Sequence, residues 1–448
     1  MDYHFCEKIT ISRFKSHNIF NSSPNPHGWR HDCVLLDFTF GNFGPFRDDA
    51  TISMQATSST EHDNNLIKTD LKDDVLSSAI IFGPNAAGKT SVIDALYSLR
   101  YLVKNVDDSR RAATIYNPFR LSRGTRESPV RMRIRLLLDG VKYDYKVEYL
   151  EGIIINESLY HYPKGRPARV FERADTRDYI GAKKRIMSMT SNSMTYLAMA
   201  GVSSDPICCK VRRAILDDII ILPSNLDGLI QESCRFAKAD PSRKAMVIEA
   251  LNTADLGVED YTSKERKLDQ SEITKIISQE LLDFVNNNQD LLAVDDVFIR
   301  HSYTGPDFDD EGLTFPLGIE SSGTKCMFGL VSPLIDALEK GKLLVMDELG
   351  AHMHPSLTRW IVKQFSSENN PNGAQLIANT HDISLMDISE LFRRDQIWFV
   401  NKDRFNGSSE LYCLSDFEGI RKDTDVMKAY LLGRFDAIPK IRHRGVIG

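Results

Sequence analysis

A glycine-bearing loop between an apolar run and a helical pattern is the feature that most constrains how this chain folds. Residues Ile80–Leu96 read IIFGPNAAGKTSVIDAL, with Gly83 at the end of the apolar run and Gly88 before the helical pattern. Strand, Gly-x-x-x-x-Gly-Lys-Thr and helix, in this order, form a phosphate-binding loop. Such glycines let successive N–H groups point at phosphate oxygens, and the helix N-terminus adds partial positive charge. The stretch therefore predicts nucleotide binding.

The polar residues of this loop have separate predicted contacts. Lys89 is expected to reach the β- and γ-phosphates, and the Thr90 hydroxyl is expected to hold Mg²⁺. The residues predicted to surround the nucleotide are Gly83, Pro84, Asn85, Ala86, Ala87, Gly88, Lys89, Thr90 and Ser91.

Length and composition bound the class of protein. A chain of 448 residues is long enough for two or three domains, and 42% hydrophobic with 26% charged residues is typical of a soluble globular protein. The formal net charge of −6 argues against bulk coating of nucleic acid but leaves room for a local basic patch. Seven cysteines without a CxxC pair indicate neither a disulfide framework nor a zinc site. No signal peptide or membrane-span pattern is present, so we expect a cytoplasmic protein without membrane contact.

The first half of the chain shows strand patterns around the loop. We expect a loop-like N-terminal extension over residues 1–32, a strand from Val34, a second strand over Ala50–Gln55 and a helix from Lys89 to about Val103. Between Pro129 and Tyr162, three runs predict antiparallel strands, and Asp139-Gly140 predicts a tight hairpin between the first two.

Three arginines share one face of the first of these strands, because Arg131, Arg133 and Arg135 alternate along it. The simpler interpretation is a solvated outer face of the sheet. The alternative is a surface that binds an anionic ligand.

Helical spacing marks the region from about 180 to 290. Segments Lys210–Ile221, Arg243–Asn252 and Glu272–Asn287 are expected to be helices, and none sustains the heptads of a long coiled coil. The predicted division is therefore an extension (1–32), a first lobe with an antiparallel subdomain (33–175), a helical insert (176–300) and a second lobe (301–448).

The last third alternates strand and helix patterns. After an acidic loop, Gly305–Gly312, the segment GIESSGTK opens a helix through Leu338, and a buried-strand run over Leu343–Met346 ends in Asp347-Glu348. A helix through Phe365 and a strand over Gln375–Ala378 follow, and the strand leads into Asn379-Thr380-His381-Asp382. This alternation predicts an α/β fold with a mixed sheet, helices on both faces and ligands at the carboxyl ends of the strands.

Acidic and imidazole side chains at these strand ends suggest catalysis. Asp347 is expected to hold Mg²⁺, and Glu348 to orient or deprotonate the attacking water. The alternative is that Asp347-Glu348 merely precedes a helix as its N-cap. His381 is expected to donate a hydrogen bond to the γ-phosphate. His352 and His354 lie two residues apart, which suits no usual metal pair.

Taken together, these motifs resemble those of ABC-type P-loop ATPases. GPNAAGKTS, ESSGTK, VMDELGAHMHP and NTHD are similar to the Walker A, signature, Walker B with D-loop, and switch-histidine segments. The pattern most resembles compact AAA ATPases of bacterial abortive-infection loci, of the RloA and AbiL type, related to the ATPase of PARIS-type defence. NFGPFRDDATISMQA, ADLGVEDY, DQIWFV and YLLGRFDAIP extend the similarity from about Leu35 onward.

The resemblance implies an ATP hydrolase that works as at least a head-to-tail homodimer. ATP held by one subunit with Mg²⁺ would be contacted by the partner's signature segment, which here is Ser321, Ser322, Gly323 and Thr324. Glu348 and His381 would be catalytic. Similar proteins control a separately encoded effector, commonly a TOPRIM-type nuclease, in anti-phage defence, with DNA or a phage protein as the trigger.

The sequence also departs from that family pattern. Ser322 stands where a second glycine is usual, Glu320 stands where leucine is usual, and no lid-loop glutamine is evident after the Walker A segment. The competing interpretation is a DNA-repair ATPase of the SMC or RecF type, against which stand the missing coiled coils and the acidic net charge. A self-contained nuclease would need a further domain after His381.

Overall fold

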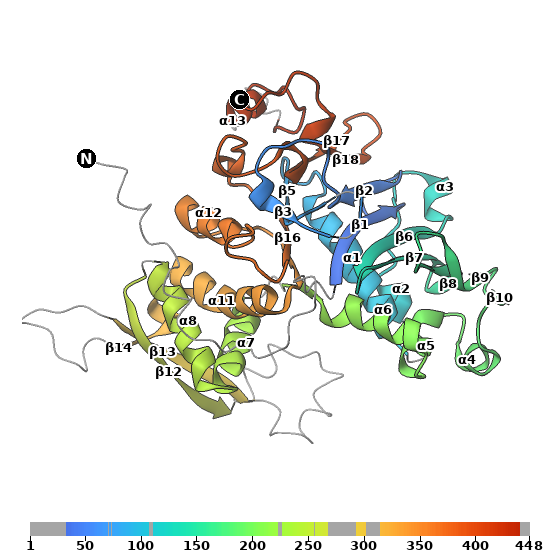
Figure 1. The fold of residues 1–448 in the computed structure, drawn as a ribbon, viewed down its shortest axis with the longest axis horizontal. Helices are drawn as coiled ribbons and strands as arrows, with labels where there is room; N and C mark the ends of the chain where they lie inside the picture. The colour runs from blue at the N-terminus through green and yellow to red at the C-terminus, as the bar shows by residue number, and fades with distance from the viewer. Residues whose placement is uncertain are drawn as a thin grey trace, which may run out of the picture. The chain divides into compact units, whose positions relative to one another are not determined.

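The computed structural model describes residues 33–69, 71–72, 74–106, 111–222, 226–254, 256–267, 293–301 and 314–439. The expected extension 1–32, the helix Glu272–Asn287 and the loop Gly305–Gly312 lie outside these residues. By its contacts the chain forms two compact units. The first unit comprises Met1–Ile221, Ala337–Leu349 and Arg359–Gly448, and the second comprises Leu222–Asp336 and Gly350–Thr358. Both are drawn in Figure 1.

A six-stranded sheet carries the phosphate-binding loop in the first unit (Figure 1). Its strands, in spatial order, are β11 (Ile219–Ile221), β15 (Leu343–Met346), β16 (Gln375–Asn379), β5 (Ser78–Phe82), β17 (Ile397–Lys402) and β18 (Ser409–Cys413). The first five are parallel, and β18 is antiparallel to β17. Every residue of β5, β15 and β16 is buried, as in parallel sheets covered on both faces. The carboxyl ends of these three strands therefore meet at one edge.

Helices cover both faces of this sheet. Trp398 and Val400 of β17 belong to the same core as the apolar face of α1 (Lys89–Lys104). Phe399 points to the opposite face, because successive strand side chains alternate. There it stacks on Tyr430 of α13 (Val426–Leu431), with ring centroids 5.9 Å apart. The predicted fold class, an α/β fold with a mixed sheet flanked by helices, is confirmed.

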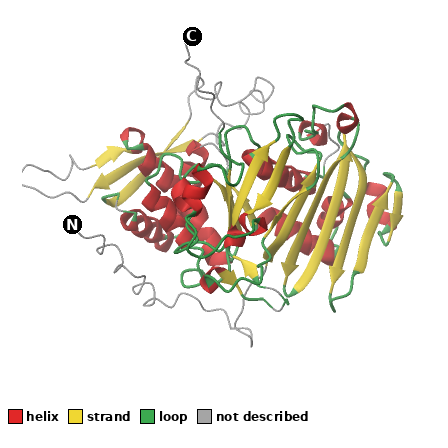
Figure 2. Cartoon of the chain, turned by 90° about the horizontal axis from the view of Figure 1, so that it is seen from above, coloured by secondary structure: helices red, strands yellow, loops and turns green. Residues whose placement is uncertain are grey.

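A seven-stranded antiparallel sheet completes the core of the first unit (Figure 2). Its order is β10 (Asp178–Ile180), β9 (Ala168–Ala174), β8 (Ile153–Tyr162), β7 (Val141–Leu150), β6 (Val130–Leu138), β1 (Cys33–Gly41) and β2 (Ala50–Ser53). The predicted antiparallel runs are confirmed, but they join the two N-terminal strands in one larger sheet. Asp139 and Gly140 have φ of 47° and 74°, which confirms the tight hairpin turn.

The three arginines of β6 are neutralised across the sheet. Each forms an ion pair, at 2.7, 2.6 and 2.5 Å; the partners of Arg131, Arg133 and Arg135 are Asp49, Asp144 and Asp37, respectively. Met132 and Ile134, which alternate with them, are buried. The geometry favours an outer face with cross-strand ion pairs over a surface for an anionic ligand.

The expected helical insert divides between the two units. Its described helices are α4 (Lys184–Met189), α5 (Tyr196–Val202), α6 (Pro206–Asp217), α7 (Leu226–Lys238) and α8 (Pro241–Thr253). The helix expected over Lys210–Ile221 ends at Asp217, and Ile219–Ile221 instead forms β11 beside β15. Three successive β-branched residues favour a strand over a last helical turn. The other predicted domain boundaries stay a prediction.

The second unit packs helices against a three-stranded sheet. The strands are β12 (Val258–Lys267), β13 (Ala293–His301) and β14 (Thr314–Pro316). Tyr261 of β12 meets Phe328 of α11 (Ser322–Lys340) edge to face, with centroids 5.0 Å apart. Among the described residues, the remaining strands and α-helices are β3 (Leu66–Ile67), β4 (Val75–Leu76), α2 (Arg111–Thr114), α3 (Arg123–Arg126) and α12 (Pro355–Lys363). None of the described helices is long and apolar enough to cross a bilayer.

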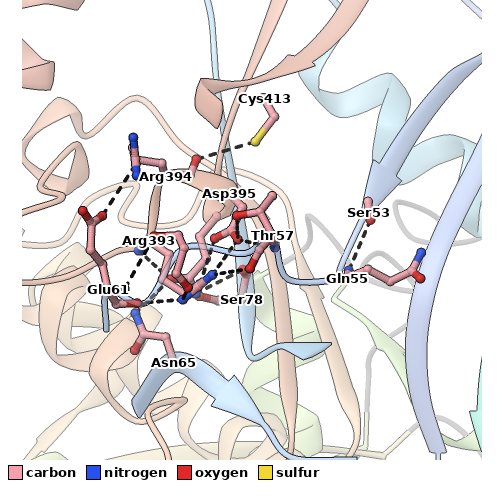
Figure 3. Close-up of polar contacts among 12 residues, drawn as sticks. Ser53, Gln55, Thr57, Glu61, Asn65, Ser78, Arg393, Arg394, Asp395 and Cys413 are labelled. Atoms are coloured by element: carbon pink, nitrogen blue, oxygen red, sulfur yellow. Dashed lines mark hydrogen bonds and ion pairs between the residues drawn. The ribbon is translucent and has the colours of Figure 1, made fainter. Parts of the chain in front are cut away.

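A buried ion pair fixes a long loop to the segment before β17 (Figure 3). Arg393 is 0% and Asp395 3% exposed, and their closest nitrogen and oxygen are 2.9 Å apart. The guanidinium also donates to the carbonyls of Ser59 and Glu61, at 2.9 and 2.7 Å. The carboxylate accepts from the backbone N–H and the hydroxyl of Thr57, at 2.8 and 2.7 Å. This network, which we call the Arg393 clamp, ties the loop after β2 to the six-stranded sheet.

Candidate active site

The loop after β5 needs glycine at both ends. Gly83 has a φ of 153°, and a Cβ there would lie 2.3 Å from the carbonyl oxygen of Val400. Gly88 has a φ of 112°, and a Cβ there would lie 2.7 Å from Pro45. Neighbouring strands and loops thus enforce the glycine spacing, and the backbone between the glycines is free to turn its N–H groups inward.

Lys89 begins α1 with its ammonium group held inside the loop. Nζ donates to the carbonyl oxygens of Gly83 and Pro84, at 2.8 and 3.1 Å. Burial lowers the pKa of Lys89, and the Asp347 and Glu348 carboxylates oppose that shift. The ammonium therefore lies at the centre of the loop, where it now binds only the partial negative charges of two carbonyl oxygens. A phosphate bound there would give it a full negative charge as partner.

Two oxygen ligands suited to Mg²⁺ come together from distant parts of the sequence. The Thr90 hydroxyl donates to Oδ1 of Asp347 at 3.1 Å. Thr90 follows β5, and Asp347 follows β15, two strands away in the sheet. Hydroxyl and carboxylate oxygens are the donors that Mg²⁺ prefers, so this pair fits the predicted metal site.

Asn379 links the two acidic residues, a function that we did not predict. Its side chain is fully buried at the end of β16; the amide N–H₂ donates to Oδ1 of Asp347, and the amide oxygen accepts the Glu348 N–H at 2.8 Å. The only sequence signal was its place at the end of a buried strand, directly before Thr380 and His381. Asn379 thereby orients the Asp347 carboxylate and the backbone of Glu348.

Glu348 and His381 face the loop from the next strand ends. Glu348 has a φ of 56°, a left-handed conformation that is costly for a residue with a side chain and that the Asn379 contact helps to hold. Partial removal from water and the Lys89 ammonium lower the pKa of His381, against the opposing effect of the Glu348 and Asp347 carboxylates, and this favours the neutral imidazole. A neutral ring can donate one hydrogen bond and accept another.

Lys89, Thr90, Glu348, Asn379 and His381 line one cavity of about 440 Å³, which is within the size range of small-ligand sites. It is lined by Pro45, Asn85, Ala86, Gly88, Lys89, Thr90, Ser91, Glu348, Asn379 and His381. Gly83, Pro84 and Ala87 line an adjoining cavity of about 820 Å³, which shares Asn85, Ala86 and His381 with the first. The structure thus brings the predicted loop residues together with Glu348 and His381.

The N-cap alternative for Asp347-Glu348 is not supported. The next helix, α12, begins only at Pro355, and the intervening residues form turns. Neither carboxylate is therefore placed to cap that helix.

The signature-like segment belongs to the second unit. The Ser321 hydroxyl accepts the Thr324 N–H at 3.1 Å and caps the start of α11, while Ser321 and Ser322 are exposed. A Cβ on Gly323 would lie 3.2 Å from the carbonyl of His352, a close approach that favours glycine. These four residues are therefore not among those that the first unit gathers around the loop.

The unusual Glu320 before this segment has a structural partner. Its carboxylate lies 2.9 Å from Nε2 of His301, at the end of β13. A leucine there could not make this contact, which ties the start of the signature segment to the three-stranded sheet.

Several solved structures are similar to this chain at low sequence identity. The chain is similar to the SMC head bound to the C-winged helix domain of ScpA (13% identity, covering 85% of this chain and 97% of that chain, TM-score 0.41). It is also similar to the SMC head domain from Thermotoga maritima, with 14% identity, coverage of 85% of this chain and 98% of that chain, and a TM-score of 0.37. A third similar structure is the Smc head domain with an extended coiled coil bound to the C-terminal domain of ScpA, derived from Pyrococcus furiosus. Its identity is 11%, the match covers 90% of this chain and 99% of that chain, and the TM-score is 0.37.

A comparison with curated proteins finds no match. A family model described as "AAA domain, putative AbiEii toxin, Type IV TA system" matches residues 78–181 and 220–387. These residues include the loop after β5, the signature-like segment, Asp347-Glu348 and His381, and they make up more than half of the chain. This protein therefore belongs to that family of AAA domains.

Proposed function

We propose that the chain hydrolyses ATP to ADP and phosphate with the help of Mg²⁺. The observation that carries the proposal is the 3.1 Å contact between the Thr90 hydroxyl and the Asp347 carboxylate, beside the buried Lys89 ammonium. Glu348 and His381 line the same cavity. Membership of an AAA family supports ATP as the nucleotide.

Each residue of the site has a defined task in this reaction. Backbone N–H groups of the loop and the Lys89 ammonium bind the β- and γ-phosphates. Mg²⁺ held by Thr90 and Asp347 would neutralise negative charge on these phosphates. Glu348 accepts a proton from the water that attacks the γ-phosphorus, while the bond to the β–γ bridging oxygen breaks. His381 donates a hydrogen bond to the γ-phosphate.

Lys89→Ala is expected to weaken ATP binding roughly a hundredfold, because the variant removes a buried charge that meets the phosphates directly. Titration calorimetry with ATP and Mg²⁺ measures the change. Lys104→Ala, an exposed lysine at the other end of α1, is the matched control and should bind like the unmodified protein. Tight binding by Lys89→Ala would contradict the assignment of the loop.

We propose further that a second copy of the chain completes the site. The exposed Ser321 and Ser322 hydroxyls and the N–H groups at the start of α11 are suitable donors to a γ-phosphate. In a head-to-tail dimer, each site would combine the loop of one subunit with the signature segment of the other. Hydrolysis would then require assembly, whereas ATP binding would not.

Mixing two inactive variants tests this composite site. Lys89→Ala disables the loop, and Ser322→Asp places a negative charge against the γ-phosphate at a helix position that tolerates Asp. Random head-to-tail pairing would leave about a quarter of all sites intact, so the mixture should regain about a quarter of the hydrolysis rate. Mixing Lys89→Ala with the doubly substituted chain should regain none. Failure of the first mixture, with both variants folded and assembled, would exclude the composite site.

The biological role that we propose is that of a cytoplasmic sensor or scaffold in anti-phage defence. Within the AAA family, the similarity to ATPases of the RloA and AbiL type supports this role, and so does the family's description in terms of toxin systems. ATP-driven association of subunits would control a separately encoded effector, for example a TOPRIM-type nuclease, in response to DNA or a phage protein. Co-purification of the chain with the products of neighbouring genes, with and without ATP, tests the partnership.

A further inference from the structure

A narrow basic loop forms the tip of the hairpin between β8 and β9. The tip, Pro163–Pro167, reads PKGRP, and all five residues are exposed. Gly165 has a φ of 73°, and no atom lies within 4 Å of where its Cβ would be. The Gly165 N–H donates to the carbonyl of Tyr162 at 3.2 Å, and the Tyr162 ring lies 4.0 Å from Nζ of Lys142. The base of the tip is therefore fixed, while Lys164 and Arg166 stand in open solvent.

The tip belongs to a basic edge of an otherwise acidic chain. Residues 164–185 contain eight Lys or Arg against three Asp or Glu, whereas the whole chain has a net charge of −6. Arg169 is paired with Glu172 and Lys183 with Asp205. Within the part of the chain that the structure describes, five exposed cations at this edge have no acidic partner: Lys164, Arg166, Arg177, Lys184 and Arg185.

A cavity rich in hydroxyl groups lies at the other end of β9. It has a volume of about 730 Å³ and includes Arg177 and Lys184 in its lining. Short polar side chains in the same lining are those of Thr176, Ser188, Thr190, Ser191, Asn192 and Ser193. Hydroxyl, amide and cationic side chains together are the usual donors to nucleic-acid phosphates.

We propose that this edge, formed by the hairpin tip, β9, β10 and α4, binds duplex DNA. Lys164 and Arg166 enter the minor groove, while Arg177, Lys184 and Arg185 contact phosphates of the backbone. The groove is only about 6 Å wide, which suits a tip built around a glycine, and its narrowing in A·T tracts attracts arginine. The seven residues of β9 span about 23 Å, so the two groups of cations meet the duplex at separate points within one helical turn.

Two features favour DNA over an acidic protein as the occupant. The cations form two groups along an edge, with Arg177 and Lys184 in the lining of the cavity and Lys164 and Arg166 at the tip. The tip between two prolines also offers little area for a protein interface of ordinary size. Nothing in this binding depends on ATP hydrolysis, so it is tested without nucleotide, and its outcome is independent of the proposed enzymatic function.

Fluorescence anisotropy with labelled duplexes of about two helical turns tests the proposal, at about 50 to 200 mM NaCl. A duplex with a central A·T tract should bind roughly tenfold more tightly than a G·C duplex, and netropsin, which occupies the minor groove, should displace the protein. Arg166→Ala should remove this preference. Replacing Arg177, Lys184 and Arg185 with Glu should weaken the binding of both duplexes equally. The dependence of the logarithm of the binding constant on the logarithm of the salt concentration should become less steep by about 3.

Control variants elsewhere on the surface show whether DNA binding is specific to the basic edge. Reversal of three exposed lysines elsewhere, Lys363, Lys422 and Lys428, should leave DNA binding unchanged. The proposal is overturned if neither duplex binds, if Arg166→Ala keeps the A·T preference, or if the control reversals act as strongly as those at the edge. Tighter binding of poly-glutamate than of either duplex would also overturn it, and would assign the edge to an acidic protein.

Discussion

Replacing Glu348 with Gln is expected to slow ATP hydrolysis by about 10²- to 10⁴-fold, the usual contribution of a general base. The amide fills the same space and tolerates the same backbone conformation, in which Glu348 has a φ of 56°. It cannot accept a proton from the attacking water. ATP affinity should change little, because Lys89, Thr90 and Asp347 remain. Phosphate release at saturating ATP measures the rate, and equilibrium binding measures the affinity.

A slow variant that still binds ATP should also accumulate in its assembled form. If two copies close around ATP and separate after hydrolysis, Glu348→Gln should elute as a larger species in gel filtration with ATP and Mg²⁺, and as the smaller species without them. Glu418→Gln removes an exposed carboxylate from another loop and serves as the control. Hydrolysis at the unmodified rate by Glu348→Gln would remove this residue from catalysis.

Local signals account for the parts of the fold that were predictable. The glycine spacing before Lys89, the Asp139-Gly140 turn and the apolar run at Leu343–Met346 each depend on residues close in sequence. The helix from Lys89 was expected to end near Val103 and ends at Lys104. At these places the backbone preference of the residues and the spacing of their hydrophobic side chains favour the same secondary structure. Tertiary contacts then stabilise a structure that the segment already favours.

Pairings between distant segments were not predictable. The loop after β5 meets Asp347 only because β16 lies between β5 and β15, with Met346 opposite Ala378. That register places Asn379 against both acidic residues, and one strand residue more or less would turn its side chain to the other face. The sequence locates Asn379 at a strand end but holds no local signal for its neighbour.

The same limitation explains one wrong assignment, at Ile219–Ile221, and one contact of a correctly predicted strand that the sequence did not indicate. Ile219–Ile221 continues a helical pattern and becomes a strand because β15 offers an open edge, more than 100 residues later in the chain. The strand from Val34 joins β6 and also contacts the other sheet, where the Leu35 N–H donates to the side chain of Gln375. Neither contact can be predicted from the hydrophobic pattern of the neighbouring residues.

Asp395→Ala is expected to lower the free energy of unfolding by about 3–5 kcal/mol, the usual cost of removing one partner from a buried ion pair. Arg393 would keep its bonds to the Ser59 and Glu61 carbonyls but would lose its counter-charge in a site with 0% exposure. The N–H and hydroxyl of Thr57 would lose their acceptor as well. Urea unfolding, followed by tryptophan fluorescence, measures the loss.

Two further variants separate the buried charge from the rest of the Arg393 clamp. Asp48→Ala breaks the exposed ion pair with Arg47 and should cost within about 1 kcal/mol, because water screens that pair. Arg393→Met combined with Asp395→Leu removes both charges, so much of the stability lost in Asp395→Ala should return. A cost for Asp395→Ala no greater than that for Asp48→Ala would show that the clamp does not stabilise the start of β17. The loop after β2 would then be held to the six-stranded sheet by its other contacts, which include the bonds from the Asn65 amide to the Leu391 carbonyl and the Gln396 side chain, at 2.7 and 2.8 Å.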